Sequence, residues 1–291
     1  MNEPSAAITA DDLKWDVRQR LKLLEATALL TGWVRTQSLV AVFGISRAQA
    51  SKDFALYLKV RPDNLRYDRS SKRYVANAAF HPWLLRGKTS ELLSLVSQVP
   101  GVDRPVVALT AQAPAVAMVN PLERELDLSV FRVISQAATN GLRVSLSYQS
   151  MNRPEPAALI LSPHSLVYSG FRWHVRAFSD SHDDYRDFVL ARIRGPVKLL
   201  DVEGVSAADD QAWHQMLAVT VQPHPALPKA QQAVIAEDYG MTDGQITVSV
   251  RQALLGYFLT LMRLGPEQQH PEPKVQQIVL ANPDELSPYL W

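Results

Sequence analysis

Apolar residues near the N-terminus of this 291-residue chain recur every three or four positions. This spacing places them on one face of a helix, and it runs from Leu13 to Ala28 before Gly32 offers a stop. Residues 35–62 then predict two shorter helices, with Thr36 capping the first and Gly44 providing a tight turn. Three consecutive helices are therefore expected before about residue 60.

The second of the two short helices has a buried and an exposed side. Ser46 is expected to cap it, while Ala50, Phe54 and Tyr57 form its apolar stripe. Polar donors on the opposite side are typical of the recognition helix of a helix-turn-helix. The residues of this helix predicted to contact DNA are Ser46, Arg47, Gln49, Ser51 and Lys52.

A hairpin with a basic tip follows this helix. Leu65 and Tyr67 precede the turn and Tyr74 follows it. Such a hairpin after a helix-turn-helix is a wing that can reach DNA phosphates. The wing residues predicted to contact DNA are Arg66, Arg69, Ser71, Lys72 and Arg73. A helical docking module with a solvated basic surface is the alternative interpretation.

Residues 81–121 differ in character from what precedes them. The stretch "HPWLLRGKTSELLSLVSQV" predicts a helix that packs through Leu92, Leu93 and Val96, and prolines then interrupt the chain as far as Pro121. Prolines break regular elements and suit an extended connector. We therefore expect a DNA-binding domain at 1–80 and a helical, proline-rich linker at 81–121.

Alternating patterns dominate residues 122–205. A helix is predicted to end at Asn140-Gly141, and strands follow over 142–150, 158–178 and 185–193. One helix followed by several short strands favours a small β-barrel or a strongly bent sheet.

One of these strands, "FRWHVRAF", is lopsided. Alternation places Trp173 and Val175 on one face and Arg172, His174 and Arg176 on the other, and the later stretch "ARIR" adds two more arginines. Arginine forks suit phosphate, so the cluster can be an anion receptor. Alternatively, the arginines pair with the aspartates of "SHDDYRD" on a solvated rim.

The last segment, residues 206–291, predicts a small α/β domain. Its expected elements are strands near 219–225, 245–250 and 275–281 and helices near 228–240 and 251–265. The second helix is strongly apolar, so its inner side must be covered either by its own sheet or by a two-fold partner.

Charge is spread unevenly along the chain. The first 80 residues contain 13 Lys and Arg against 8 Asp and Glu, although the whole chain carries a net charge of only +1. This concentration of positive charge is what a DNA-binding face requires. There is no cysteine, which fits a reducing cytoplasm, and no apolar run long enough to span a bilayer. We expect a soluble, cytoplasmic protein without a membrane partner.

Motifs of enzymes are missing from the sequence. It contains no Walker loop, GxGxxG or GxSxG motif, and His164, His174 and His182 lack the fixed spacing of a metal site. We therefore expect no catalysis, no metal and no cofactor. An RNA-binding regulator is the second function considered, because a small β-barrel and a basic wing can both bind RNA.

The segment "LSPHSLVYSGFRWHVRAFSDSHDDYRDFVLARI" resembles the WYL domain, an SH3- or Sm-like barrel of bacterial transcription regulators. The Pro-His, Arg-Trp and Arg-Ile pairs match, whereas the namesake tripeptide reads Trp173-His174-Val175. The chain is most similar to WYL repressors encoded beside phage-defence operons. The resemblance implies an α+β, multidomain fold with a winged helix-turn-helix, a WYL barrel at 122–205 and a dimerisation domain at 206–291.

The resemblance also implies binding partners. The family's barrel senses a ligand, for which nucleotides and single-stranded DNA are candidates, and its C-terminal extension supports a homodimer. Two recognition helices would then meet a palindromic operator. The residues that match the family's pocket are Tyr148, Ser150, His164, Arg172 and Arg192, and strand alternation adds Arg176.

Overall fold

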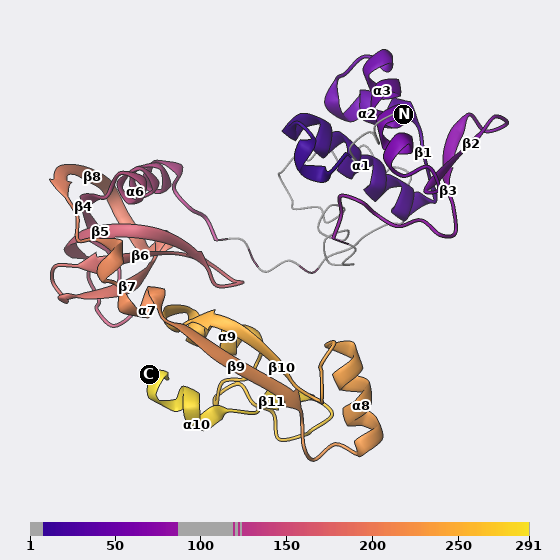
Figure 1. Ribbon diagram of the computed structural model, residues 1–291. Helices are drawn as coiled ribbons and strands as arrows, with labels where there is room; N and C mark the ends of the chain where they lie inside the picture. The colour runs from indigo at the N-terminus through magenta and orange to yellow at the C-terminus, as the bar shows by residue number, and fades with distance from the viewer. Residues whose placement is uncertain (1–7, 87–118, 120–121, 123, 291) are drawn as a thin grey trace, which may run out of the picture. The chain divides into compact units, whose positions relative to one another are not determined.

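The computed structural model describes residues 8–86, 119, 122 and 124–290. Its contacts divide the chain into two compact units, residues 1–120 and 121–291 (Figure 1). No helix in the described ranges is long and apolar enough to cross a membrane. The predicted domain boundaries at residues 80, 121 and 205 stay predictions.

The first unit combines three helices with a small antiparallel sheet. After a 3-10 turn at Ala10–Asp12, its elements are α1 (Trp15–Thr31), β1 (Trp33–Val34), α2 (Thr36–Phe43), α3 (Arg47–Val60), β2 (Leu65–Asp68) and β3 (Arg73–Ala76). The strand order is β1-β3-β2. The predicted hairpin is therefore extended by β1, a two-residue strand that the sequence pattern did not indicate.

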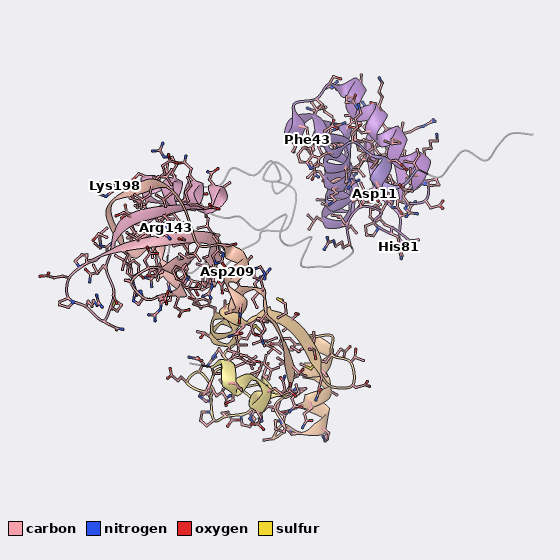
Figure 2. The ribbon with its side chains drawn as sticks, turned by 60° about the vertical axis from the view of Figure 1, so that its left-hand side comes forward. Asp11, Phe43, His81, Arg143, Lys198 and Asp209 are labelled. Atoms are coloured by element: carbon pink, nitrogen blue, oxygen red, sulfur yellow. The ribbon has the colours of Figure 1, made fainter. Side chains whose placement is uncertain are left out.

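Local chemistry explains where these helices begin and end. Gly32 and Gly44 close α1 and α2 with φ of 76° and 63°, a conformation that favours glycine. The Ser46 hydroxyl accepts from the Gln49 N–H at 3.1 Å, so the predicted cap of α3 is confirmed. Thr36 does not cap α2, because Arg35 occupies that position without a side-chain hydrogen bond. Phe43, labelled in Figure 2, ends α2.

A buried carboxylate fixes the chain after the wing onto α1. Leu21, Leu24, Phe54 and Tyr57 are at most 1% exposed, and Glu25 is fully buried beside them. Its oxygens accept from the Tyr57 hydroxyl and from the backbone N–H groups of three consecutive residues, Trp83, Leu84 and Leu85. Most of the helix predicted from "HPWLLRGKTSELLSLVSQV" and the proline-rich connector lie outside the described residues.

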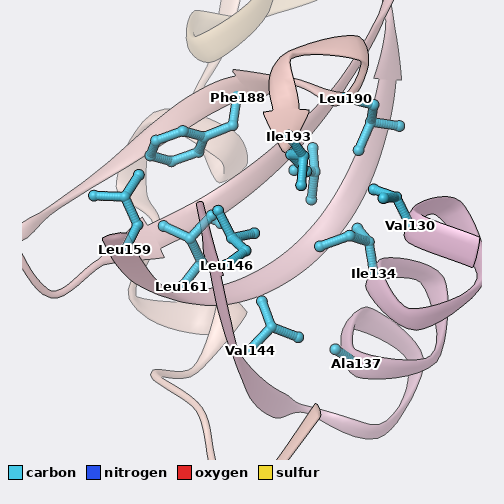
Figure 3. Close-up of a cluster of buried hydrophobic side chains, with 12 residues drawn as sticks. Val130, Ile134, Ala137, Val144, Leu146, Leu159, Leu161, Phe188, Leu190 and Ile193 are labelled. Atoms are coloured by element: carbon cyan, nitrogen blue, oxygen red, sulfur yellow. The ribbon is translucent and has the colours of Figure 1, made fainter. Parts of the chain in front are cut away.

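The second unit begins with a helix packed on a five-stranded antiparallel sheet. Its elements are α6 (Leu128–Asn140), β4 (Leu142–Tyr148), β5 (Ala157–Tyr168), β6 (Trp173–Ser179), β7 (Asp184–Val189) and β8 (Ile193–Glu203). The order is β7-β6-β5-β4-β8, so β7 and β8 are edges and the expected barrel is not closed. Figure 3 shows Val130, Ile134 and Ala137 of α6 facing Val144 and other apolar side chains of the sheet.

The C-terminal part has a second, three-stranded sheet in the order β10-β9-β11. Its elements are a 3-10 turn (Ala207–Asp209), α7 (Gln211–His214), β9 (Met216–Pro223), α8 (Lys229–Asp238), β10 (Ile246–Arg251), a 3-10 turn (Gln252–Leu254), α9 (Leu255–Leu261), β11 (Ile278–Leu280), α10 (Pro283–Leu286) and a 3-10 turn (Ser287–Tyr289). Leu255, Leu259 and Leu264 are buried in this part's own core. The apolar helix is therefore covered mainly by its own sheet, the first of the two predicted alternatives.

Candidate nucleic-acid and ligand sites

The first turns of α3 present the predicted recognition residues unequally. Ser46, Arg47, Ser51 and Lys52 are exposed. Gln49 is half-buried, and its Nε2 donates to Asp53 Oδ1 at 3.0 Å. Asp53 also accepts from Arg20 Nε at 2.6 Å. The Gln49 amide nitrogen is thus engaged inside the unit, and Arg47 and Lys52 are the freer donors.

The tip of the wing is organised by one aspartate. Asp68 accepts from the Ser70 N–H and from the hydroxyls of Ser70 and Ser71, and these bonds lower the pKa of Asp68 to about 2. The Ser71 hydroxyl is therefore used within the turn. Lys72 adopts a positive φ of 50° at its corner. The exposed cations of the wing are Arg66, Arg69 and Lys72.

Arg73 lies beside the turn of the wing, where its backbone pairs with that of Asp68, and over the indole ring of Trp33. Its Cζ is 4.8 Å from the ring centroid, and Arg35 Cζ lies 5.0 Å from the same centroid. Neither Trp33 nor Arg35 was among the predicted site residues. The sequence could have indicated this contact only through the spacing of Trp33 and Arg35. Two residues at this spacing lie on one face only if the chain there is a strand, and no strand was predicted at this position.

Four of the six predicted ligand residues line one cavity in the second unit. This cavity of about 610 Å³ has Tyr148, Arg172, Arg176 and Arg192 in its wall. The C-terminal part supplies the remaining side through Ala212, Gln252, Ala253, Tyr257 and Tyr289. Sequence reasoning did not find these C-terminal residues, because nothing local in the sequence indicates that α9 folds back over the arginine-bearing strand.

Arg172 and Arg192 are the unpaired cations of this cavity. Neither forms a salt bridge with any residue that the structure describes. Both arginines act electrostatically on His174, which is only 1% exposed and also lines the cavity. Burial, followed by Arg172 and Arg192, lowers the pKa of His174 to about 4, so its ring is neutral near pH 7. Such a positive, partly enclosed site suits an anion.

His174 lines the cavity together with Arg172 and Arg176, on the face where strand alternation placed it. Its ring stacks at 4.9 Å from Tyr257, and its Nδ1 is buried without a hydrogen-bond partner. The histidine that replaces the middle letter of the tripeptide is thus a wall residue of the cavity. On the opposite face Val175 is buried, whereas Trp173 is 47% exposed and contacts the ring of Tyr168 at 5.0 Å.

Arg176 is committed to holding the two sheets together. It is 7% exposed, and its Nε and Nη2 donate to the two carboxylate oxygens of Asp210 at 2.6 and 3.0 Å. Its Nη1 lies 3.4 Å from Asp187 Oδ1. Arg176 thus pairs with an aspartate of "SHDDYRD" as the alternative interpretation expected, but the pairing is buried rather than on a solvated rim, and its closer acid, Asp210, caps α7. Figure 2 shows the neighbouring Asp209 at the junction of the two sheets.

Asp210 is the centre of this network. Burial acts to raise the pKa of Asp210, but Arg176, the Trp213 N–H and His164 hold it below its ordinary value. Asp187 differs, since burial raises its pKa despite Arg176 and despite the hydroxyl that Tyr257 donates at 3.0 Å. Asp187 thus links Arg176 in β6 to Tyr257 in α9.

The other two predicted ligand residues lie outside the cavity wall. His164 Nε2 is 3.1 Å from Asp210 Oδ2, its side chain is 6% exposed, and burial lowers its pKa. Ser150 Oγ accepts from the Asn152 N–H at 3.1 Å. Tyr148 does line the cavity, and its hydroxyl accepts from the Val189 N–H at 3.1 Å, which leaves its own hydrogen free to donate.

Among the described residues, no group of three or more His, Asp or Glu side chains could hold a metal ion.

Three family descriptions match successive parts of the chain. Residues 16–98 match the winged helix-turn-helix domain of BrxR transcriptional regulators, residues 129–197 the WYL domain, and residues 216–286 the C-terminal dimerization domain of BrxR transcriptional regulators. The predicted order of a winged helix, a WYL domain and a C-terminal domain is confirmed.

Two relatives match almost the whole chain. The DNA-binding transcriptional repressor CapW of Escherichia coli (strain KTE188) is 36% identical over 281 residues, which cover 94% of this chain and 91% of that protein. The chain belongs to the CapW family. The CapW of Pseudomonas aeruginosa is 34% identical over 274 residues and covers 94% of this chain and 91% of its own.

One solved structure extends the comparison beyond the CapW family. The proteasome accessory factor B/C (PafBC) of Arthrobacter aurescens covers 96% of this chain and 47% of its own, at 18% identity and a TM-score of 0.27. At this identity and TM-score, the similarity supports no conclusion about the function or the domain arrangement of this chain.

Proposed function

We propose that this protein is a sequence-specific DNA-binding transcriptional repressor. The observation that carries the proposal is the exposed basic surface of α3 and the wing in a chain of the CapW family, whose relatives are named DNA-binding transcriptional repressors. Arg47 and Lys52 are assigned to base edges, and Arg66, Arg69 and Lys72 to phosphates. Its target is the operator of a phage-defence operon, in keeping with the WYL repressors that the sequence resembles.

A homodimer is part of this proposal. Residues 216–286 match a dimerization domain, and two copies would present two recognition helices to a palindrome about one helical turn apart. The exposed apolar side chains available for such an interface in this part include Met216, Val234, Leu261 and Val275. Burying them against a second copy removes apolar surface from water.

The cavity of the second unit is assigned to a phosphate-bearing ligand, a nucleotide or single-stranded nucleic acid. Arg172 and Arg192 supply charge without a carboxylate partner in the described residues, and Tyr148 supplies a hydroxyl and a ring for stacking. Because α9 and the last 3-10 turn form the opposite wall, occupancy would act directly on the part that matches the dimerization domain. We assign the protein no enzymatic activity and a cytoplasmic location.

A mobility-shift assay on the DNA upstream of the protein's own gene tests the proposal. The expected result is a complex of one dimer with a palindromic duplex, and a changed affinity when a short single-stranded oligodeoxynucleotide is added. Equal affinity for an RNA hairpin, or failure to bind the upstream duplex, would contradict it.

A further inference from the structure

Two guanidinium groups of the first unit share one tryptophan ring. Arg35 and Arg73 both place their Cζ within 5.0 Å of the Trp33 centroid. Tryptophan is the strongest aromatic partner of a cation, so one ring can orient two arginines. They come from different elements, since Arg35 lies between β1 and α2 while Arg73 begins β3. The pair therefore lies beside the wing turn, close to the start of α2.

The backbone around both arginines is fixed by the sheet. Trp33 and Val34 of β1 pair with Val75 and Tyr74 of β3, and α2 starts immediately after Arg35. Arg35 Nη2 also lies 3.5 Å from the carbonyl oxygen of Ser71 in the wing turn. The positions of the two guanidinium groups are thus set before any ligand arrives, which lowers the cost of binding one.

The pair lacks a counter-charge within the described part of the unit. Neither Arg35 nor Arg73 forms a salt bridge there, and the nearest carboxylate in the wing sequence, Asp68, accepts from Ser70 and Ser71. Arg73 Nε is buried and has no hydrogen-bond partner. Two like charges repel each other, so an anion bound to both guanidinium groups would relieve that repulsion.

We propose that Arg35 and Arg73 form a phosphate clamp for duplex DNA and that Trp33 is its positioning residue. The inference rests on the proposed DNA-binding function and extends it to Arg35, which belongs neither to the recognition helix nor to the wing tip. Arginine suits the task because its planar fork matches phosphate oxygens while its face stacks on the indole. The clamp holds one backbone phosphate between the contacts of α3 and those of the wing tip.

The salt dependence of binding tests the clamp. Affinity of the full-length protein for the upstream duplex is measured by fluorescence anisotropy across a salt series for wild type, Arg35→Gln, Lys72→Ala and the control Lys198→Gln. Lys198 is an exposed residue of β8, so its substitution removes one surface charge outside the first unit. Arg35→Gln is expected to make the slope of log K against log salt shallower by about 0.9, the value for one phosphate contact. Lys198→Gln is expected to leave it unchanged.

A second comparison isolates Trp33. Trp33→Leu is expected to weaken binding when both arginines are present and to have little further effect in the Arg35→Gln, Arg73→Gln variant, because the ring acts through them. If Arg35→Gln lowers Tm yet keeps the wild-type slope while Lys72→Ala flattens it, the arginine pair is structural and the clamp is overturned with the DNA-binding function intact. Loss of all duplex binding by wild type would instead overturn the proposed function.

Discussion

The basic residues of α3 and the wing differ from those of the cavity in their solvent exposure and in their carboxylate partners. On α3 and the wing the cations are exposed, namely Arg47, Lys52, Arg66, Arg69 and Lys72. In the cavity Arg176 is buried and meets two carboxylates, whereas Arg172 and Arg192 are half-buried and meet none in the described residues. Burial of a charge requires a partner, so the paired arginine serves the fold and the unpaired ones can serve a ligand.

The first unit repeats the same division internally. Arg20 is buried and pairs with Asp53 at 2.6 Å and with Asp16 at 2.8 Å. Arg47, five positions before the Lys52 of the same helix, is exposed to solvent. The division between paired, buried arginines and exposed ones is therefore found in both units and among residues of one type. It depends on whether a carboxylate lies within reach once the chain has folded.

Removal of Arg176 should have the largest effect on stability. Arg176→Ala leaves Asp210 and Asp187 buried without their cation, and breaking a buried pair in this way costs about 3–5 kcal/mol. Hydrogen exchange of the β6 amides in the full-length protein measures the loss, with Arg172→Ala, immediately before β6, as the matched control. A loss below about 1 kcal/mol, or an equal loss in both variants, would contradict the division of roles.

The ligand response should depend on Arg192 by a smaller amount. A ligand that distinguishes two states of the dimer typically changes operator affinity by about 1–3 kcal/mol, or about 5–150-fold. Arg192→Ala is expected to retain operator affinity and to lose the response to a short single-stranded oligodeoxynucleotide in a mobility-shift assay. Arg194→Ala is the control, since Arg194 is exposed and donates to the Ala191 carbonyl at 2.9 Å. A full response in Arg192→Ala would remove this arginine from the site.

The buried histidine should make stability depend on pH. The folded pKa of His174 is about 4, below its ordinary 6.5, so the unfolded chain takes up the proton first as the pH falls. The stability that His174 contributes is therefore present above pH 6.5 and is lost as the pH falls from there towards 4.

The matched variant is His174→Tyr, which carries the middle residue of the namesake tripeptide. Urea unfolding of wild type and variant between pH 4 and 7 should show a smaller pH dependence in His174→Tyr. Parallel curves would mean that His174 titrates at its ordinary value in the folded protein.

Local features of this fold were predictable from the sequence, and long-range ones were not. Gly32, Gly44 and Gly141 end helices as predicted. The left-handed backbone conformation at a helix end favours glycine, and this preference can be read from the local sequence. β8 was missed beyond residue 193, since Gly195 and Pro196 interrupt its alternation. β1 is only two residues long and exists only because β3 pairs with it.

The candidate sites show the same limit. Strand alternation placed Arg172, just before β6, and Arg176 within it on one face, and both line the cavity, but alternation could not predict that only Arg176 is paired with carboxylates. Asp210, which pairs with Arg176, lies 34 residues later in a segment where no element had been assigned. The C-terminal wall around Tyr257 is likewise a product of tertiary packing, for which the sequence pattern carries no local signal.

The central claim is that the cations of α3 and the wing that lack a carboxylate partner bind the DNA backbone, and the most direct test uses DNA itself. The dissociation constant for the upstream duplex is measured from about 50 to 200 mM salt in wild type, Lys72→Ala and Lys198→Ala. The account predicts a steep wild-type slope that becomes shallower by about 0.9 in Lys72→Ala and stays unchanged in Lys198→Ala. An identical slope in all three proteins, or equal flattening by both substitutions, would contradict it.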